Sequence, residues 1–336
     1  MSLDSNRRKS LNFIPIFAAM RTLYLFFCLL TSASVWAQNI DRKQLLTDIE
    51  ILSSDVYEGR RTGTRENQMA ANYIVSRFKT IGLDLYQDSF KHPFTFKTRQ
   101  GQNINATNLI GYIKGKSDRV IVISAHYDHI GITRSLINNG ADDNASGVAG
   151  LLAMAAYFKN HKPNNTLLFV SFDAEEMGLQ GAYAFLKNPV LDGDRIKLIV
   201  NLDMISHNDK GEIYAAGAYK NPVLKEVLQN ADKNTGVKIL FGHDDPKLGK
   251  NDWTMQSDHG PFAQNNIPFV YFGVEDHKDY HKPTDEYQNI NKDFFYGASN
   301  AILNSVIKLD KKLKKVIKNS DPAVQRTLKE KMIMNN

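Results

Sequence analysis

Four short apolar runs constrain the fold of this chain more than any other feature, because they show no alternation of polar and apolar residues. The runs are Val120–Ser124, Leu167–Ser171, Leu198–Val200 with its continuation to Met204, and Pro268–Phe272. Continuous β-branched and apolar segments of this length are typical of strands buried on both faces of a parallel sheet. The sequence therefore predicts strands that are covered by helices on each side.

Helical periodicity of apolar residues accounts for much of the remaining body of the chain. We expect helices over Ile40–Ser53, Glu66–Thr80, Gly147–Phe158 and roughly Phe294–Lys318. Residues 84–119 look antiparallel or irregular and set no domain boundary. The third helix lies between the first two apolar runs, which is a strand–helix–strand rhythm. These patterns predict an α/β protein with a single open, mostly parallel mixed sheet and helices on both faces.

The net charge of +6 invites a nucleic-acid partner, but its location argues against one. Residues 1–37 carry a balance of +3 and residues 308–336 a balance of +6, which leaves −3 for the body between them. A polyanion-binding domain would concentrate basic residues within the folded body. We therefore expect no nucleic-acid partner, and we interpret residues 319–336 as a basic C-terminal tail.

The N-terminal segment has the pattern of a secretory signal peptide. Arg21 precedes the apolar run Leu23–Leu30, and small residues follow up to Ala37. The apolar run is too short to span a membrane. We expect residues 1–37 to be removed and the protein to be exported, to the periplasm or beyond, without a stable membrane anchor. The single cysteine, Cys28, excludes a disulfide within the chain and any zinc module built on cysteine.

Acidic residues and histidines follow the predicted strands, at the point where each strand ends. They are His126 and Asp128, Asp142 and Asp143, Asp173, Glu175 and Glu176, Asp203, and His281. In open α/β sheets, ligands bind outside the carboxyl ends of the strands. A single acid there could cap a helix, but recurrence once per strand favours one shared site.

The types of these residues select the chemistry of the site. Histidine and carboxylate without thiolate suit Zn²⁺, and Mn²⁺ or Co²⁺ could replace it. Two histidines and at least three carboxylates exceed the needs of one tetrahedral metal. A pair of metals that share a bridging carboxylate would use them all and leave room for water. Glu175, beside a candidate ligand, could take a proton from that water, and Asp128 could orient His126.

Five blocks of this sequence resemble the zinc aminopeptidases of peptidase family M28. They are His126-Tyr-Asp128, Gly140-Ala-Asp-Asp-Asn144, Asp173-Ala-Glu-Glu176, Asn201-Leu-Asp203 and Tyr280-His281, in the order of the family. Gly59–Gly63 and Ser257–Phe262 resemble, more weakly, segments common in its bacterial members. The resemblance implies the zinc-peptidase, phosphorylase/hydrolase-like architecture, with residues 38–318 as the catalytic domain.

The resemblance also implies a role for each residue. Two zinc ions would have five protein ligands: Asp143 as the bridge, Glu176 and His281 on one metal, and His126 and Asp203 on the other. Glu175 matches the general base, and Asp128 matches the acid that orients a ligand. A cis peptide bond is implied between Asp143 and Asn144.

The implied function is an aminopeptidase that hydrolyses the N-terminal peptide bond of peptides with a free N-terminus, using a metal-activated water. Two alternatives stay open. A glutaminyl-cyclase-like acyltransferase would share the fold but use a single zinc ion. A periplasmic binding protein with a degenerate site would bind without catalysis.

Overall fold

The computed structural model describes residues 40–187 and 195–320. The expected signal peptide, residues 1–37, and residues 321–336 of the expected tail lie outside this part of the chain. None of the helices in the described residues combines the length and the apolar character needed to cross a bilayer.

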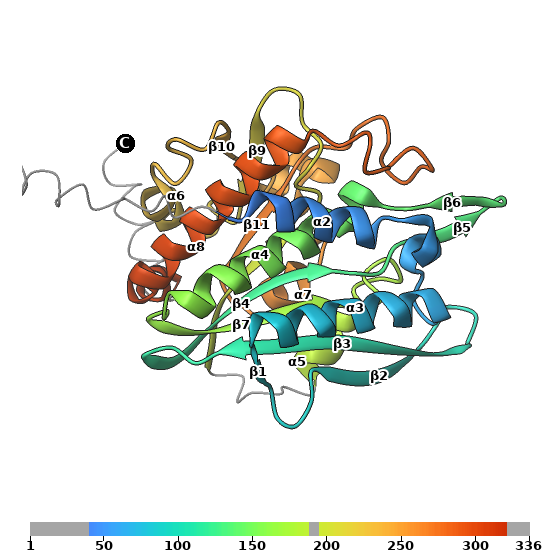
Figure 1. Cartoon of the computed structure of the whole chain (residues 1–336). Helices are drawn as coiled ribbons and strands as arrows, with labels where there is room; N and C mark the ends of the chain where they lie inside the picture. The colour runs from blue at the N-terminus through green and yellow to red at the C-terminus, as the bar shows by residue number, and fades with distance from the viewer. Residues whose placement is uncertain (1–39, 188–194, 321–336) are drawn as a thin grey trace, which may run out of the picture. The chain divides into compact units, whose positions relative to one another are not determined.

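Nine strands of the described residues form one mixed sheet in the spatial order β1-β3-β7-β4-β8-β11-β9-β10, with β2 paired to β3 (Figure 1). They are β1 (Asp84–Leu85), β2 (Lys91–Lys97), β3 (Asn103–Ile113), β4 (Ser117–His126), β7 (Asn165–Phe172), β8 (Ile196–Leu202), β9 (Glu212–Ala216), β10 (Lys238–Phe241) and β11 (Phe269–Gly273). A separate two-stranded hairpin joins β5 (Gly131–Thr133) to β6 (Leu136–Asn138).

The four predicted apolar runs are the four central strands. Strand β4 is parallel to β7 and to β8, and β8 is parallel to β11. Residues 84–113 form the antiparallel edge, where β3 pairs with β7, β2 and β1. The expected fold class is therefore confirmed, with the parallel pairing concentrated at the centre of the sheet.

Helices cover both faces of this sheet, as Figure 1 shows. One face carries α2 (Arg42–Leu52), α3 (Arg65–Ile81), α4 (Gly147–Asn160) and α8 (Lys292–Ser320), which match the four expected helices within a few residues. The other face carries α5 (Gln180–Lys187) and α7 (His259–Gln264), while α6 (Val223–Leu228) packs against α8. Helix α3 ends at Gly82, whose φ of 82° supplies the left-handed cap.

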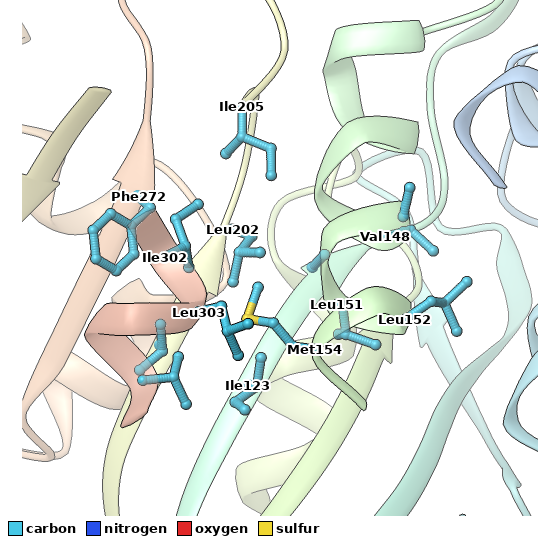
Figure 2. Close-up of a cluster of buried hydrophobic side chains, with 14 of the residues drawn as sticks. Ile123, Val148, Leu151, Leu152, Met154, Leu202, Ile205, Phe272, Ile302 and Leu303 are labelled. Carbon is cyan, nitrogen blue, oxygen red and sulfur yellow. The ribbon is translucent and has the colours of Figure 1, made fainter. Parts of the chain in front are cut away.

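Successive residues of the central strands enter two different cores. Ile121 and Ile123 of β4 pack with helices α2, α3, α4 and α8, whereas Val120 and Val122 pack with α5 and α7. Figure 2 shows the larger core, where Met154 of α4 lies close to Ile123 and to side chains of β8 and α8. Burial on both faces explains why these strands show no alternation in sequence.

We expect Leu151→Ala to lower the free energy of unfolding by about 2–5 kcal/mol, because the side chain is fully buried and its removal leaves a cavity. Leu85→Ala is the matched control, since Leu85 is 46% exposed. Urea unfolding of the two variants and the wild type checks this. Equal losses in both variants would contradict the placement of α4 in the core.

Candidate metal centre

The residues that the sequence singles out converge at the carboxyl ends of the central strands. His126 is the last residue of β4, and Asp203 follows β8 directly. Glu175 and Glu176 lie in the loop after β7, and His281 lies in the loop after β11. Asp143 lies in a helical turn, η2 (Ala141–Ser146), which leads into α4.

Asp143 directs its two carboxylate oxygens toward two different histidines. Its Oδ1 lies 3.4 Å from Nε2 of His126, and its Oδ2 lies 3.0 Å from Nε2 of His281. On the first side, His126 Nε2 is also 3.3 Å from Oδ1 of Asp203. On the second side, His281 Nε2 is 3.5 Å from Oε1 of Glu176. The structure thus separates the residues into two groups that share Asp143.

The hydrogen bonding of His126 leaves its Nε2 available to a cation. Nδ1 lies 3.1 Å from the main-chain carbonyl oxygen of Asp128, which can only accept, so Nδ1 carries the proton. Nε2 then faces carboxylate oxygens with its lone pair, unless a second proton makes the ring an imidazolium. A divalent metal between these atoms satisfies all of them, so the donor set fits zinc.

The carboxylate of Asp128 makes contacts that differ from those the sequence suggests. It lies 3.8 Å from Nδ1 of His126, beyond hydrogen-bond range. It accepts instead from the main-chain N–H groups of Glu175 and Glu176, at 3.1 and 3.3 Å. Asp128 therefore orients His126 through its main chain, while its side chain holds the segment that carries the two glutamates.

His129 joins the site although the sequence analysis did not select it. Its Nδ1 lies 2.9 Å from Oε1 of Glu176 and 3.7 Å from Oδ2 of Asp143. His129, Asp143 and Glu176 offer ligand atoms within 4.8 Å of one another. His126, Glu175 and Asp203 form a second such group. The side of the site that holds Glu176 thus has two histidines, His129 and His281.

Burial and mutual charge shift the pKa values of the site residues strongly. Burial raises the pKa of Glu175 well above its ordinary range, and His126 opposes this while Asp258 and Asp203 add to it. For His281, burial lowers the pKa, but hydrogen bonds to Asp143 and Glu176 outweigh it and raise the value to about 10. Strong pKa shifts with specific charge partners are typical of functional sites.

Main-chain hydrogen bonds fix the position of Asp143. The buried carboxylate of Asp285 accepts from the N–H groups of Asp142 and Asp143, at 2.8 and 3.0 Å. The peptide bond between Asp143 and Asn144 is cis, as the resemblance implies.

Asp142 itself accepts from the N–H and hydroxyl of Ser206, at 2.6 and 2.8 Å. Asp142 thus supports the turn and contributes no oxygen to the two groups around Asp143.

Asp173 also lies outside those two groups, with a fully buried carboxylate. It accepts from Thr62 Oγ1 at 2.9 Å, Asn67 Nδ2 at 3.1 Å, Tyr127 Oη at 3.0 Å and the Thr107 N–H at 2.9 Å. Polar neighbours therefore satisfy this acid without a metal.

A third group of ligand-type residues lacks the geometry of a metal site. His207, His277 and Asp279 offer atoms within 4.8 Å of one another. The two imidazole rings, however, are stacked 3.8 Å apart with planes only 9° from parallel. Lone pairs of stacked parallel rings lie in two separate planes and cannot both point at one ion. His277 instead lies 3.0 Å, through Nε2, from Asp142 Oδ2.

Comparison with known proteins agrees with this geometry. The sequence model of peptidase family M28 matches residues 108–306 of this chain. This range includes every residue of the two groups around Asp143. The chain belongs to peptidase family M28. The resemblance seen in the sequence is therefore confirmed.

Curated relatives of this M28 family member share modest identity with it. The alkaline phosphatase isozyme conversion protein of Escherichia coli is 27% identical over 58% of this chain and 61% of its own length. Aminopeptidase YwaD of Bacillus subtilis is 28% identical over 66% of this chain and 48% of its own length. The chain thus spans about half, or somewhat more, of the length of these relatives.

Solved structures share the fold of this M28 family member. A glutaminyl cyclase of Porphyromonas gingivalis has a TM-score of 0.66 at 18% identity, covering 80% of this chain and 98% of that one. A zinc aminopeptidase of Bacillus subtilis has a TM-score of 0.63 at 18% identity, covering 81% and 96%. At this identity the likeness establishes the architecture, and the reaction has to be argued from the site.

We expect Asp258→Asn to flatten the pH dependence of stability in the metal-free protein. Burial raises the pKa of Asp258 from 3.8 to about 7; His126 opposes this and Asp203 adds to it. Neither carboxylate oxygen has a hydrogen-bond partner. The unfolded carboxyl loses its proton near pH 4 while the folded one keeps it to about pH 7, so the wild type loses stability across this interval.

Urea unfolding in a chelator at pH 5 to 8 checks this. The stability difference between Asp258→Asn and the wild type should grow by at most about 1.4 kcal/mol per pH unit up to about pH 7 and then level off. Asp209→Asn, at an exposed acid, is the control. Parallel curves of unfolding free energy against pH for the wild type and Asp258→Asn would contradict the raised pKa of Asp258.

Proposed function

We propose that this protein is a zinc-dependent aminopeptidase that hydrolyses the N-terminal peptide bond of peptides at a two-zinc site. The placement of Asp143 carries this proposal, because its Oδ1 faces His126 and its Oδ2 faces a different histidine, His281. Asp143 would bridge the metals, with His126 and Asp203 on one and Glu176 and His281 on the other. A lone zinc ion would leave one of the two groups without a cation.

Each residue around the bridge then has a defined task. Zinc bound there would lower the pKa of a water molecule and polarise the carbonyl group under attack. Glu175 would accept the proton of that water and deliver it to the leaving amine. Its burial raises its pKa, whereas nearby cations would lower it, and these opposing influences suit a group that takes a proton and then gives it up.

Asp128 supports this reaction through the main chain of the glutamate loop, which is the segment between β7 and α5 that carries Glu175 and Glu176. Its carboxylate accepts from the N–H groups of Glu175 and Glu176, so one side chain sets the positions of both the base and a ligand. His129 donates from Nδ1 to Oε1 of Glu176, at 2.9 Å, and so orients that carboxylate. The base and the neighbouring ligand are therefore placed by residues that need not touch the substrate.

We also propose that the protein is exported, on the basis of the signal-peptide pattern in residues 1–37. Its partners would then be peptides outside the cytoplasm. N-terminal sequencing of the mature protein tests this: a start near Gln38 supports export, and retention of residues 1–37 contradicts it.

We expect Glu175→Gln to retain its metal and to lose about 10²- to 10⁴-fold in kcat, since the amide keeps the shape of the side chain but cannot accept the proton. Hydrolysis of aminoacyl amides, with metal analysis of the same sample, measures both quantities. Glu50→Gln, at an exposed position of α2, is the matched control. Activity near that of the wild type in Glu175→Gln would rule out its role as the base.

We expect two zinc ions per wild-type chain and fewer in His126→Ala, because that variant removes a ligand from one side of Asp143. Elemental analysis after dialysis against zinc gives the count. A single zinc in the wild type, with pyroglutamate formed from a peptide that begins with glutamine, would favour the cyclase reaction instead. Two zinc ions without hydrolysis of any aminoacyl amide in a broad panel would favour a binding protein.

A further inference from the structure

Arg60 has the largest fully buried side chain in the described residues, at 1% exposure. It belongs to the Gly59–Gly63 segment that resembles bacterial members of the family, and the proposed chemistry gives it no task. Burying a guanidinium group is strongly unfavourable unless its hydrogen-bond donors find acceptors. Its contacts therefore indicate what it does.

The guanidinium group of Arg60 bonds to main-chain carbonyl oxygens alone. Nε donates to Tyr127 at 2.9 Å, Nη1 to Leu52 at 2.7 Å and to Asn139 at 2.6 Å, and Nη2 to Gly140 at 2.9 Å. These carbonyls come from the end of α2, the loop after β4 and the segment between β6 and η2. One side chain thus joins three separate segments.

Two of these segments carry the proposed metal ligands. Tyr127 lies between His126 and Asp128, and Gly140 directly precedes the turn that holds Asp143. Arg60 therefore spans the gap between the main chain at His126 and the main chain at Asp143. The 3.4 Å distance between His126 Nε2 and Asp143 Oδ1 is measured across this gap.

The charge of Arg60 also faces the acids of the site. Burial lowers its pKa to about 10, and the carboxylates of Asp143, Asp285, Asp128 and Glu176 oppose that change. The group therefore stays protonated at neutral pH. A fixed positive charge beneath these acids reduces their mutual repulsion before any cation binds.

The backbone around Arg60 is shaped to deliver this side chain. Gly59 and Arg60 have φ angles of 69° and 50°, both in the left-handed region. A Cβ on Gly59 would lie 2.1 Å from the carbonyl oxygen of Asn138, so no other residue permits this approach to the β5–β6 hairpin. Arg60 itself also adopts the left-handed conformation, which is unfavourable for an L-residue with a long side chain.

We propose that Arg60 is a positioning residue that holds the His126 and Asp143 segments at the separation needed to bind metal. This inference rests on the proposed function, because it assumes that these segments supply metal ligands. A side chain that only filled space would leave zinc affinity unchanged once the protein was folded.

Arg60→Lys and Arg60→Met separate this role from packing. Lysine keeps the charge, but its single nitrogen cannot reach three segments, and methionine keeps much of the volume without charge. Arg61→Lys is the matched control, because Arg61 is the exposed neighbour and its side chain donates to the carbonyl oxygen of Ile130. Zinc affinity of the full chain is measured by chelator competition, at a temperature where near-ultraviolet circular dichroism shows a folded protein.

We expect zinc affinity to fall about 10- to 100-fold in Arg60→Lys, as for other residues that orient ligands, and further in Arg60→Met. At saturating zinc, kcat should fall while KM changes little. Arg61→Lys should match the wild type in all three quantities. Wild-type affinity and kcat in both folded Arg60 variants, with only a lower urea midpoint, would overturn the proposal.

Hydrogen exchange of the wild type gives a test that does not depend on variants that fold. A frame held by Arg60 is formed before metal arrives, so residues 126–129 and 139–143 should be equally protected with and without zinc. Free exchange of both segments in the metal-free protein would overturn the proposal. Failure of the wild type to bind zinc would instead overturn the proposed function.

Discussion

Repulsion among buried carboxylates is the constraint on which the rest of this structure depends. Four carboxylates interact electrostatically with the buried guanidinium group of Arg60: those of Asp128, Asp143, Glu176 and Asp285. Carboxylates so placed are costly unless donors or cations face them. The fold meets this need partly with main-chain N–H groups: Asp128 accepts from residues 175 and 176, and Asp285 accepts from residues 142 and 143. The carboxylates of Asp143 and Glu176 face histidine nitrogens instead, an arrangement that divalent metals would complete.

Much of this fold can be predicted from the sequence, because the clearest patterns in the sequence arise from the need to bury apolar side chains. The central strands had to be apolar on both faces, and α4 had to be apolar where it packs on them, so their patterns were unambiguous. Strands β9 and β10 have five and four residues and carried too little pattern to be recognised. Helix α7, with six residues, falls below the length at which periodicity is informative.

The site was predictable to the extent that strand ends supply its residues. His129 is absent from the predicted site because strand alternation places His126 and Asp128 on one face, whereas β4 ends at His126 and the chain turns thereafter. The same turn moves the carboxylate of Asp128 from the ring of His126 to the glutamate loop. Arg60 was missed for a different reason. Its partners Tyr127, Asn139 and Gly140 are main-chain atoms 67, 79 and 80 positions away, and no side-chain pattern records such contacts.

These contacts divide the molecule into a frame and a set of reacting groups. The frame consists of the parallel strands and the main-chain bonds made by Arg60, Asp128 and Asp285, and it specifies positions without specifying a reaction. The glutaminyl cyclase and the zinc aminopeptidase compared above share this architecture, so the architecture by itself does not select the reaction. The reaction depends instead on side chains placed upon the frame. In the proposed function, a carboxylate whose two oxygens face different histidines, as at Asp143, would suit two metals better than one, because each cation would offset a separate set of buried negative charges.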